Sequence, residues 1–222
     1  MIKIFLVLLY LILQIHLFSI DNKKNDLLMG SIVKSDEWEI DTKKNIEYFR
    51  KNVYFKNYYY IMKSDYAVYD RVIKVWNTKG NVYFKRNFDD GNFIEMYCDN
   101  ANYDEKKELT RLSSDNRIRM IYYDNSKFEK YFAYSKNILA DNNCKKIFFN
   151  ENFELIISSI SAFSNYCVYD DIRKTFELTE KPYSIGYNND YKVYLQGEKI
   201  TINKNDLKIL VEEKVFGVIR KK

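Results

Sequence analysis

Residues 64–70 read S-D-Y-A-V-Y-D, and the fold can be predicted outward from this heptad. The same shape, a small residue followed by an alternating segment that closes on Asp or Asn, recurs at residues 35–41, 98–104, 135–141, 164–170 and 197–203. The copies follow one another at intervals of 29 to 37 residues. A period of this size is typical of stacked-repeat architectures, in which each copy is one supersecondary unit. The sequence therefore predicts about six stacked repeats.

Each heptad alternates between apolar and polar positions. The fourth and sixth residues are apolar in every copy, as in the pairs Ala67 and Tyr69 or Ala101 and Tyr103, whereas the third is mostly polar. A period of two predicts a strand with one buried face, and the closing Asp or Asn with the charged residues behind it indicates a turn.

A second marker follows each turn at a distance of 11 or 12 residues. It is Asn or Lys, and a further apolar alternation comes behind it; the markers are Asn52, Asn81, Asn116, Asn152, Lys181 and Lys214. Each repeat is therefore predicted to contain a strand, a turn, a second strand, a bend and a third strand. Because every strand has one apolar side, we expect an all-β domain.

The composition predicts a single folded domain with a mixed charged surface. The chain has 222 residues with only 1 Pro and 6 Gly, which argues against long linkers and leaves enough residues for a core. Lys and Arg total 36 against 31 Asp and Glu, a net charge of +5, and both signs are spread along the chain. This distribution is typical of a solvated surface, so we expect no nucleic-acid partner.

The residues that most catalytic and metal sites need are missing from the repeats. His16, the only histidine, lies in the apolar N-terminal segment, and no P-loop, G-x-S-x-G or dinucleotide fingerprint occurs. This removes Ser–His and Cys–His catalysis and histidine-containing metal sites. The repeated aspartates at 41, 70, 104, 141 and 170 occupy equivalent positions and are interpreted as turn formers. We expect a protein that is not an enzyme and takes no metal or cofactor.

Three cysteines, Cys98, Cys144 and Cys167, form no metal-binding or redox motif. Cys167 occupies an inward heptad position that holds Ala or Ile in other copies, so it is interpreted as a small buried side chain. The sequence leaves open whether Cys144 and Cys167 form a disulfide in an oxidising compartment.

The N-terminus carries an export segment. Lys3 precedes an unbroken apolar run over residues 4–13, and polar residues begin at Asp21. The apolar run is as long as the core of a signal peptide and shorter than the roughly 20 residues of a comfortable membrane span. We expect residues 1–20 to be a signal peptide or an uncleaved anchor helix, residues 21–31 a polar linker, and residues 32–222 the folded domain.

The repeats resemble the OstA/LptA-type domain of the lipopolysaccharide transport machinery. The resemblance rests on S-D-Y-A-V-Y-D at 64–70 with G-N-V-Y-F at 80–84, on C-D-N-A-N-Y-D at 98–104, and on G-E-K-I-T-I-N-K-N-D-L-K-I-L-V at 197–211. It covers roughly residues 32–219. The departures are a loose third repeat and Pro182 where a Val would be expected. The resemblance implies a stacked-repeat β-jellyroll, or β-taco, in which two sheets fold over an apolar groove.

The resemblance also implies a function: a periplasmic protein of outer membrane biogenesis that shields lipopolysaccharide acyl chains in the groove. It would form part of the bridge from the inner to the outer membrane. Its partners would be LptC-like and LptD-like components of the same fold, or further copies of itself, joined through edge strands near residues 35–40 and 215–219. The residues expected to line the groove are Ala67, Tyr69, Val82, Phe84, Ala101, Tyr103, Ile138, Leu155 and Tyr169.

Two alternatives stay open from the sequence. If the leader is not cleaved, the chain would be a membrane-anchored LptC-like component tethered by residues 4–20. If the apolar faces instead pack against each other, the protein would be a β-solenoid scaffold or adhesin without a lipid cargo. The periodicity alone does not distinguish an apolar groove from a packed core.

Overall fold

The protein is all-β, as the heptads predicted. The computed structural model describes residues 31–57, 60–88, 90–127, 129–187 and 190–221, and the predicted leader and most of the predicted linker lie outside these ranges. In them the strands are β1 (Ile32–Lys34), β2 (Glu37–Asp41), β3 (Ile46–Lys56), β4 (Tyr60–Asp70), β5 (Val75–Asn87), β6 (Phe93–Asp104), β7 (Leu109–Asp124), β8 (Glu129–Asp141), β9 (Lys146–Ile157), β10 (Ile160–Asp170), β11 (Thr175–Thr179), β12 (Tyr183–Tyr187), β13 (Tyr191–Gln196), β14 (Lys199–Asn203), β15 (Ile209–Glu212) and β16 (Phe216–Lys221). None of the described residues belongs to a helix long and apolar enough to cross a membrane.

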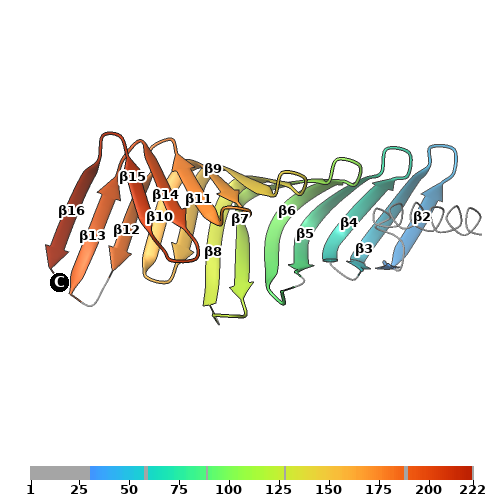
Figure 1. Cartoon of the computed structure of the whole chain (residues 1–222). Coiled ribbons are helices and arrows are strands. Elements are labelled where there is room, and N and C mark those ends of the chain that lie inside the picture. Colours follow the sequence, from blue (N-terminus) through green and yellow to red (C-terminus); the bar gives the residue numbers. More distant parts are fainter. Residues whose placement is uncertain (1–30, 58–59, 89, 128, 188–189, 222) are drawn as a thin grey trace, which may run out of the picture.

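The long strands β3 to β10 pair antiparallel in chain order and form an elongated sheet (Figure 1). Each pairing between them shifts register near its middle, as between Arg50 and Val53 in β3 or Lys79 and Val82 in β5. A shift at the same level in every strand folds the sheet along one line, which we call the crease.

The crease divides the sheet into two walls. Wall A contains the halves next to the aspartate turns: β2, β11, β14, β15 and residues 46–50, 66–70, 75–79, 100–104, 109–113, 137–141, 146–150 and 166–170. Wall B contains β1, β12, β13, β16 and residues 53–56, 60–64, 82–87, 93–98, 118–124, 129–135, 153–157 and 160–164. Their facing side chains form the core, which is the two-walled arrangement that the resemblance implied.

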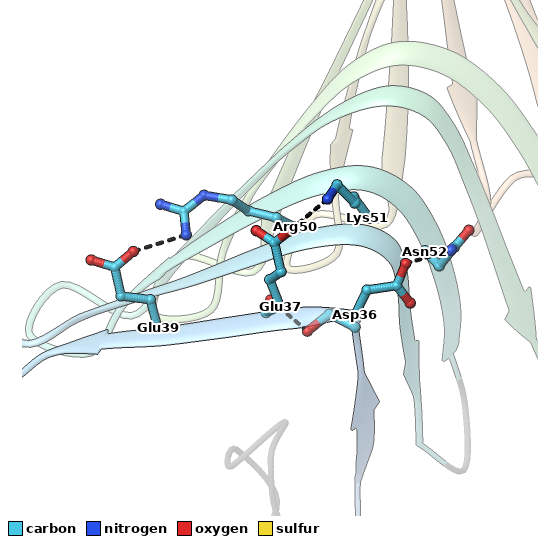
Figure 2. A network of polar contacts seen from close by, with 7 residues as sticks. Asp36, Glu37, Glu39, Arg50, Lys51 and Asn52 are labelled. Atoms are coloured by element: carbon cyan, nitrogen blue, oxygen red, sulfur yellow. Dashed lines mark hydrogen bonds and ion pairs between the residues drawn. The ribbon is translucent and has the colours of Figure 1, made fainter.

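The predicted bend markers lie on the crease. Asn52, Asn81 and Asn152 have φ angles of 50°, 47° and 55°, a left-handed conformation that Asn tolerates better than most residues. The Asn81 amide also donates to Asp65 on the next strand (2.8 Å), and the Asn52 amide donates to Asp36 (2.8 Å; Figure 2).

The third repeat bends differently. Asn116 has no positive φ, because β7 carries a wider irregularity between Ser113 and Ile118. There Asp99 accepts hydrogen bonds from the Ser114 hydroxyl (2.6 Å) and the Asp115 amide (2.8 Å). The longer spacing to Asn116 in the sequence corresponds to this wider bulge.

The repeated aspartates form turns. The Asp70 carboxylate accepts the backbone N–H groups of Val72 (2.9 Å) and Ile73 (3.1 Å), and Asp170 accepts those of Ile172 and Arg173. Asp41, Asp104 and Asp141 accept turn N–H groups in the same way. This Asx-turn geometry satisfies two amides that the strands leave unpaired.

The core is packed most tightly in the rungs formed by β9 to β14. Phe149, Phe153, Leu155, Ile157 and Leu178 are at most 1% exposed. A smaller cluster in the N-terminal rungs includes Phe49, Val53, Ala67, Tyr69 and Trp76. Cys98 and Cys167 are buried and Cys144 is exposed, and all three are free thiols. The two walls therefore hold together through direct side-chain packing over much of their length.

Each end of the sheet presents two short edge strands, one per wall. β1 and β2 form the N-terminal edge, and β15 and β16 form the C-terminal edge. Pro182 stands where the crease separates β11 from β12, and as proline it has no N–H to donate at that position.

Candidate functional site

An apolar cavity of about 260 Å³ lies between the two walls near their open rims. Along each strand, the side chains that line the cavity alternate with side chains that point outward. The lining is therefore the inward half of the period-two pattern. Wall A contributes Trp76, Tyr103, Thr110, Ala140, Ile147 and Tyr169, and wall B contributes Phe55, Tyr60, Met62, Phe84, Ile94, Met96 and Tyr122. Most of these side chains are aromatic or aliphatic, so the cavity favours an apolar ligand.

The mouth of the cavity is polar and basic. Arg86, Phe88, Asn142, Lys145 and Lys146 surround it, together with Asp141 and Asp171. Turn residues of wall A and strand ends of wall B thus place charges where an apolar ligand would meet water.

Contacts across the mouth connect the two rims. Arg86 of wall B donates to the Asn142 amide oxygen in a wall A turn (2.7 Å), and the Lys127 ammonium donates to the Asn205 carbonyl (2.9 Å). Both of these contacts are polar hydrogen bonds, whereas Phe149 and Phe153 beside the crease are packed apolar side chains. We therefore expect the rims to separate more easily than the crease.

Lys204 is a buried cation beside the cavity. Its ammonium lies 3.6 Å from the ring centre of Tyr122, and the side chain is only 6% exposed. Burial lowers the pKa of Lys204 to about 8, against the opposing attraction of Asp124. The ring faces of Tyr122 and Tyr131 offset part of the cost of holding this charge out of water.

The tyrosines of the lining stay neutral. Burial raises the pKa of Tyr103, of Tyr122 and of Tyr169 well above the ordinary value for a phenol. The Tyr169 hydroxyl donates to Asp171 (3.1 Å), which points its polar atom at the rim and leaves the ring to the cavity. The cavity therefore remains apolar throughout the physiological pH range.

The nine residues predicted to line a groove are divided between cavity and core. Phe84, Tyr103 and Tyr169 line the cavity. Ala67, Tyr69, Val82, Ile138 and Leu155 face inward but are buried in packed clusters nearer the crease or the N-terminal end. Ala101 is partly buried and packs against the main cluster. The prediction that all nine contact a lipid stays a prediction.

Several lining residues did not follow from the heptads. Trp76 and Ile147 lie on the strands after the turns, and Met96 and Tyr122 lie on wall B strands outside the heptads. The alternation in those strands could have identified them, because each occupies the same parity as its buried neighbours. The basic mouth had no sequence signal, since Arg86 and the adjacent Lys145 and Lys146 come from two repeats that are far apart in the chain.

A second hollow of about 600 Å³ lies on the outer surface of wall A. Its lining combines polar side chains, among them Asn77, Asn100 and Arg111, with apolar ones that include the predicted groove residues Ala101 and Ile138. Asn102 and Asn77 already bond to each other (2.8 Å). Within the described ranges, no group of His, Cys, Asp or Glu is arranged to hold a metal ion.

No family model and no curated protein matches the chain. Among solved structures, the chain is similar to the crystal structure of LptH from Pseudomonas aeruginosa, the LptA-homologous periplasmic component of the conserved lipopolysaccharide transport device. The match covers 86% of this chain and 94% of that chain, with 11% sequence identity and a TM-score of 0.32. At that TM-score the likeness adds nothing to what the strand order already establishes.

Proposed function

We propose that this protein binds lipid and shields acyl chains in the cavity between its two walls. The observation that carries the proposal is an apolar cavity with a basic mouth, because this pairing suits a molecule with a hydrocarbon tail and an anionic head. Each methylene taken from water contributes roughly 0.8 kcal/mol, so affinity would be spread over many lining residues. Lipopolysaccharide is the cargo that the sequence resemblance suggests.

The cavity as it stands would hold part of one chain. An engineered apolar cavity of about 150 Å³ binds benzene, so about 260 Å³ has room for a segment of an acyl chain. A lipid with several chains requires the rims to part. The few polar contacts across the mouth, such as Arg86 with Asn142, make that opening the expected response to cargo.

We further propose that the protein acts in the periplasm as part of a bridge between the membranes. Each of its four edge strands has a partner strand on one side only, among the described residues. Apolar side chains are exposed there: Trp38 at the N-terminal edge, and Phe216 and Ile219 at the C-terminal edge. Edge strands pair readily with further strands, so copies of the chain or LptC-like and LptD-like partners would extend both walls. An uncleaved leader would make the chain itself the anchored, LptC-like component.

A scaffold without cargo is the second candidate. The observation in its favour is the packed crease, where Phe149, Leu178 and Ile200 are completely buried and leave no room for a ligand. For a scaffold, the small cavity would be a gap in the packing without a ligand, and the edge strands alone would bind other proteins.

Photo-crosslinking in cells separates the two candidates. A benzophenone amino acid replaces Tyr103, which lines the cavity, and in the control it replaces its outward neighbour Asn102. A lipid adduct at position 103 and none at position 102 is the expected result. If both positions remain free of lipid in a protein that is folded and exported, the carrier function is wrong and the scaffold stands.

A further inference from the structure

The outer face of wall B carries a patch of cations and aromatic rings that the cavity does not use. We call it the wall B patch; it contains Lys63, Lys85, Arg119 and Lys130 with the rings of Tyr83, Phe93, Tyr97 and Tyr123. Strand register brings them together, since Lys63 lies opposite Tyr83, Tyr97 opposite Arg119, and Tyr123 opposite Lys130. The patch spans β4 to β8, roughly 19 Å at the usual spacing between strands.

One carboxylate organises the rings. Glu95 accepts hydrogen bonds from the hydroxyls of Tyr83 (3.0 Å), Tyr97 (3.3 Å) and Tyr123 (3.2 Å). The Phe93 and Tyr123 rings stack with their centres 4.1 Å apart. The aromatic groups therefore form a fixed platform, with their hydroxyls turned toward the centre of the patch.

The cations rest on this platform and not on carboxylates. The Lys85 ammonium lies 3.8 Å from the centre of Phe93, the Arg119 guanidinium 4.3 Å from Tyr97, and the Lys130 ammonium 5.1 Å from Tyr123. Lys63 lies 5.7 Å from Tyr83. Among the described residues none of these four cations has a carboxylate within 4.0 Å, the distance of an ion pair. With Glu95 as its one acid, the patch has a net positive charge.

The outer face of wall A balances its charges differently. Several of its cations pair with carboxylates: Arg50 with Glu39 (2.8 Å), Lys51 at the crease with Glu37 (2.6 Å), and Lys199 with Glu177 (3.0 Å). Figure 2 shows the first two pairs beside the Asp36–Asn52 contact. Turn aspartates along the wall A rim pair with turn lysines, as Asp41 does with Lys44 and Asp104 with Lys107. Carboxylates thus neutralise much of the positive charge on wall A, whereas aromatic rings hold the cations of the wall B patch.

We propose that the wall B patch docks the protein on the surface of an anionic phospholipid bilayer. Tyrosine and phenylalanine with lysine and arginine is the combination found where proteins meet lipid headgroups. Each basic side chain close to an anionic leaflet strengthens binding by roughly fivefold, equivalent to about 1 kcal/mol. Wall A, where carboxylates pair with several of the cations, would attract an anionic surface less strongly, so the patch would set the orientation.

The shape of the patch favours a bilayer over a discrete ligand. The patch lies apart from the two cavities described above, which are between the walls and on wall A. Its cations are spaced over several strands, which suits an extended array of phosphate groups. This inference does not depend on the cavity or its cargo.

Amine footprinting tests the docking face directly. The full-length protein is acetylated with and without vesicles of phosphatidylcholine, either pure or containing phosphatidylglycerol, and each lysine is followed by mass spectrometry. We expect Lys63, Lys85 and Lys130 to be protected several-fold by the anionic vesicles only. Lys79 and Lys199 on wall A should react equally in all samples. Equal protection on both walls, or none on wall B, would overturn the proposal.

A matched pair of variants provides the second readout. The wall B variant carries Lys63→Gln, Lys85→Gln, Arg119→Gln and Lys130→Gln, and the wall A control carries Arg50→Gln, Lys79→Gln, Arg111→Gln and Lys199→Gln, so both lose the same charge. Any binding through the leader is common to both proteins. Flotation should show that the wall B variant binds anionic vesicles on the order of 500-fold more weakly, because four losses of roughly fivefold multiply, with the control within about threefold of wild type.

The remaining outcomes are equally decisive. Equal weakening in both variants would mean that net charge alone drives binding, and the patch would have no specific role. If the wall B variant binds vesicles normally but loses self-association in sedimentation, the partner of the patch is a second copy of the chain. Either result rejects the bilayer as the ligand of this face.

Discussion

Single residues fix the crease, and Gly80 shows how. It has a φ of 78°, and a Cβ added there would lie 2.5 Å from Oδ2 of Asp65 on the neighbouring strand. Asp65 is held in place by the Asn81 amide, so it has little freedom to move away. Other strands carry Lys51 or Glu151 in the left-handed conformation at the crease. The need for glycine at position 80 is therefore mainly steric.

Gly80→Ala should lower the free energy of unfolding by about 2 kcal/mol, from the clash with Asp65 and the added backbone strain. Urea denaturation measures it. The control is Gly186→Ala in β12, where the added Cβ meets nothing within 4 Å and φ is not positive; it should be neutral or slightly stabilising. Asp65→Ala in the Gly80→Ala background should recover part of the loss. A loss in the Gly186 variant as large as that in the Gly80 variant would contradict this account.

Lys204 should make stability depend on pH. Its folded pKa of about 8 lies below the unfolded value near 10.4, so between these values the unfolded chain binds the extra proton and stability rises with pH. The gain is roughly 2 kcal/mol, reduced from the full shift because the group retains some solvent contact. Chemical denaturation at pH 7 and pH 9.5 compares wild type with Lys204→Met. The variant should lack this rise, and an identical pH profile in both proteins would exclude Lys204 as its source.

At the scale of elements, a pair of short strands forms each end of the sheet, and these strands determine how copies of the protein can pair. The N-terminal edge exposes 59% of Trp38, and the C-terminal edge exposes 56% of Phe216. Two different edges make a heterologous, head-to-tail contact, which extends into a chain of copies. An isologous contact would instead use one edge twice and stop at a dimer.

The two geometries give different results with edge variants. Trp38→Lys should disable the N-terminal edge and Phe216→Lys the C-terminal edge, so each variant alone should sediment as a monomer. An equimolar mixture retains one intact pair of edges and should form a one-to-one dimer, whereas wild type should form longer assemblies. Dimers of either variant alone, or a mixture in which both variants stay monomeric, would contradict head-to-tail pairing.

At the scale of the whole molecule, the packed crease acts as a fixed line about which the rims can part. Arg86 and Asn142 connect the rims directly above the cavity. A covalent link at this point would hold the cavity at its present volume without touching its apolar lining.

A thiol-specific bifunctional reagent long enough to replace the reach of the arginine side chain should link Arg86→Cys to Asn142→Cys across the mouth, in a Cys144→Ser background. The crosslinked protein should bind a multi-chain lipid at least tenfold more weakly than the protein without the crosslink, because the rims cannot separate. Binding of a single-chain fatty acid, whose tail fits in the existing cavity, should change less than about threefold. Fluorescent-lipid titration with and without the crosslink measures this. Equal binding of the multi-chain lipid in both samples would mean that loading needs no opening.

The sequence by itself determined the strands, turns and bends, because these depend on local chemistry. Ala67 and Tyr69 face inward by alternation, Asp70 accepts its own turn amides, and Asn81 tolerates the left-handed bend, all within a few residues of chain. The two-walled arrangement followed from the resemblance in the repeats. The free edges at both ends followed from the order of the strands.

Only the tertiary structure decided which inward side chains enclose space. Tyr103 and Leu155 obey the same alternation, yet Tyr103 lines a cavity and Leu155 is packed near the crease, because the distance between the walls varies along and across the fold. The same holds for charge. Arg119 and Arg50 are both outward arginines over tyrosine rings, but only Arg50 also pairs with a carboxylate, that of Glu39. The distance between the walls depends on residues far apart in the chain, and so does the identity of the side chain that each charge contacts on a neighbouring strand. A local sequence pattern does not encode either property.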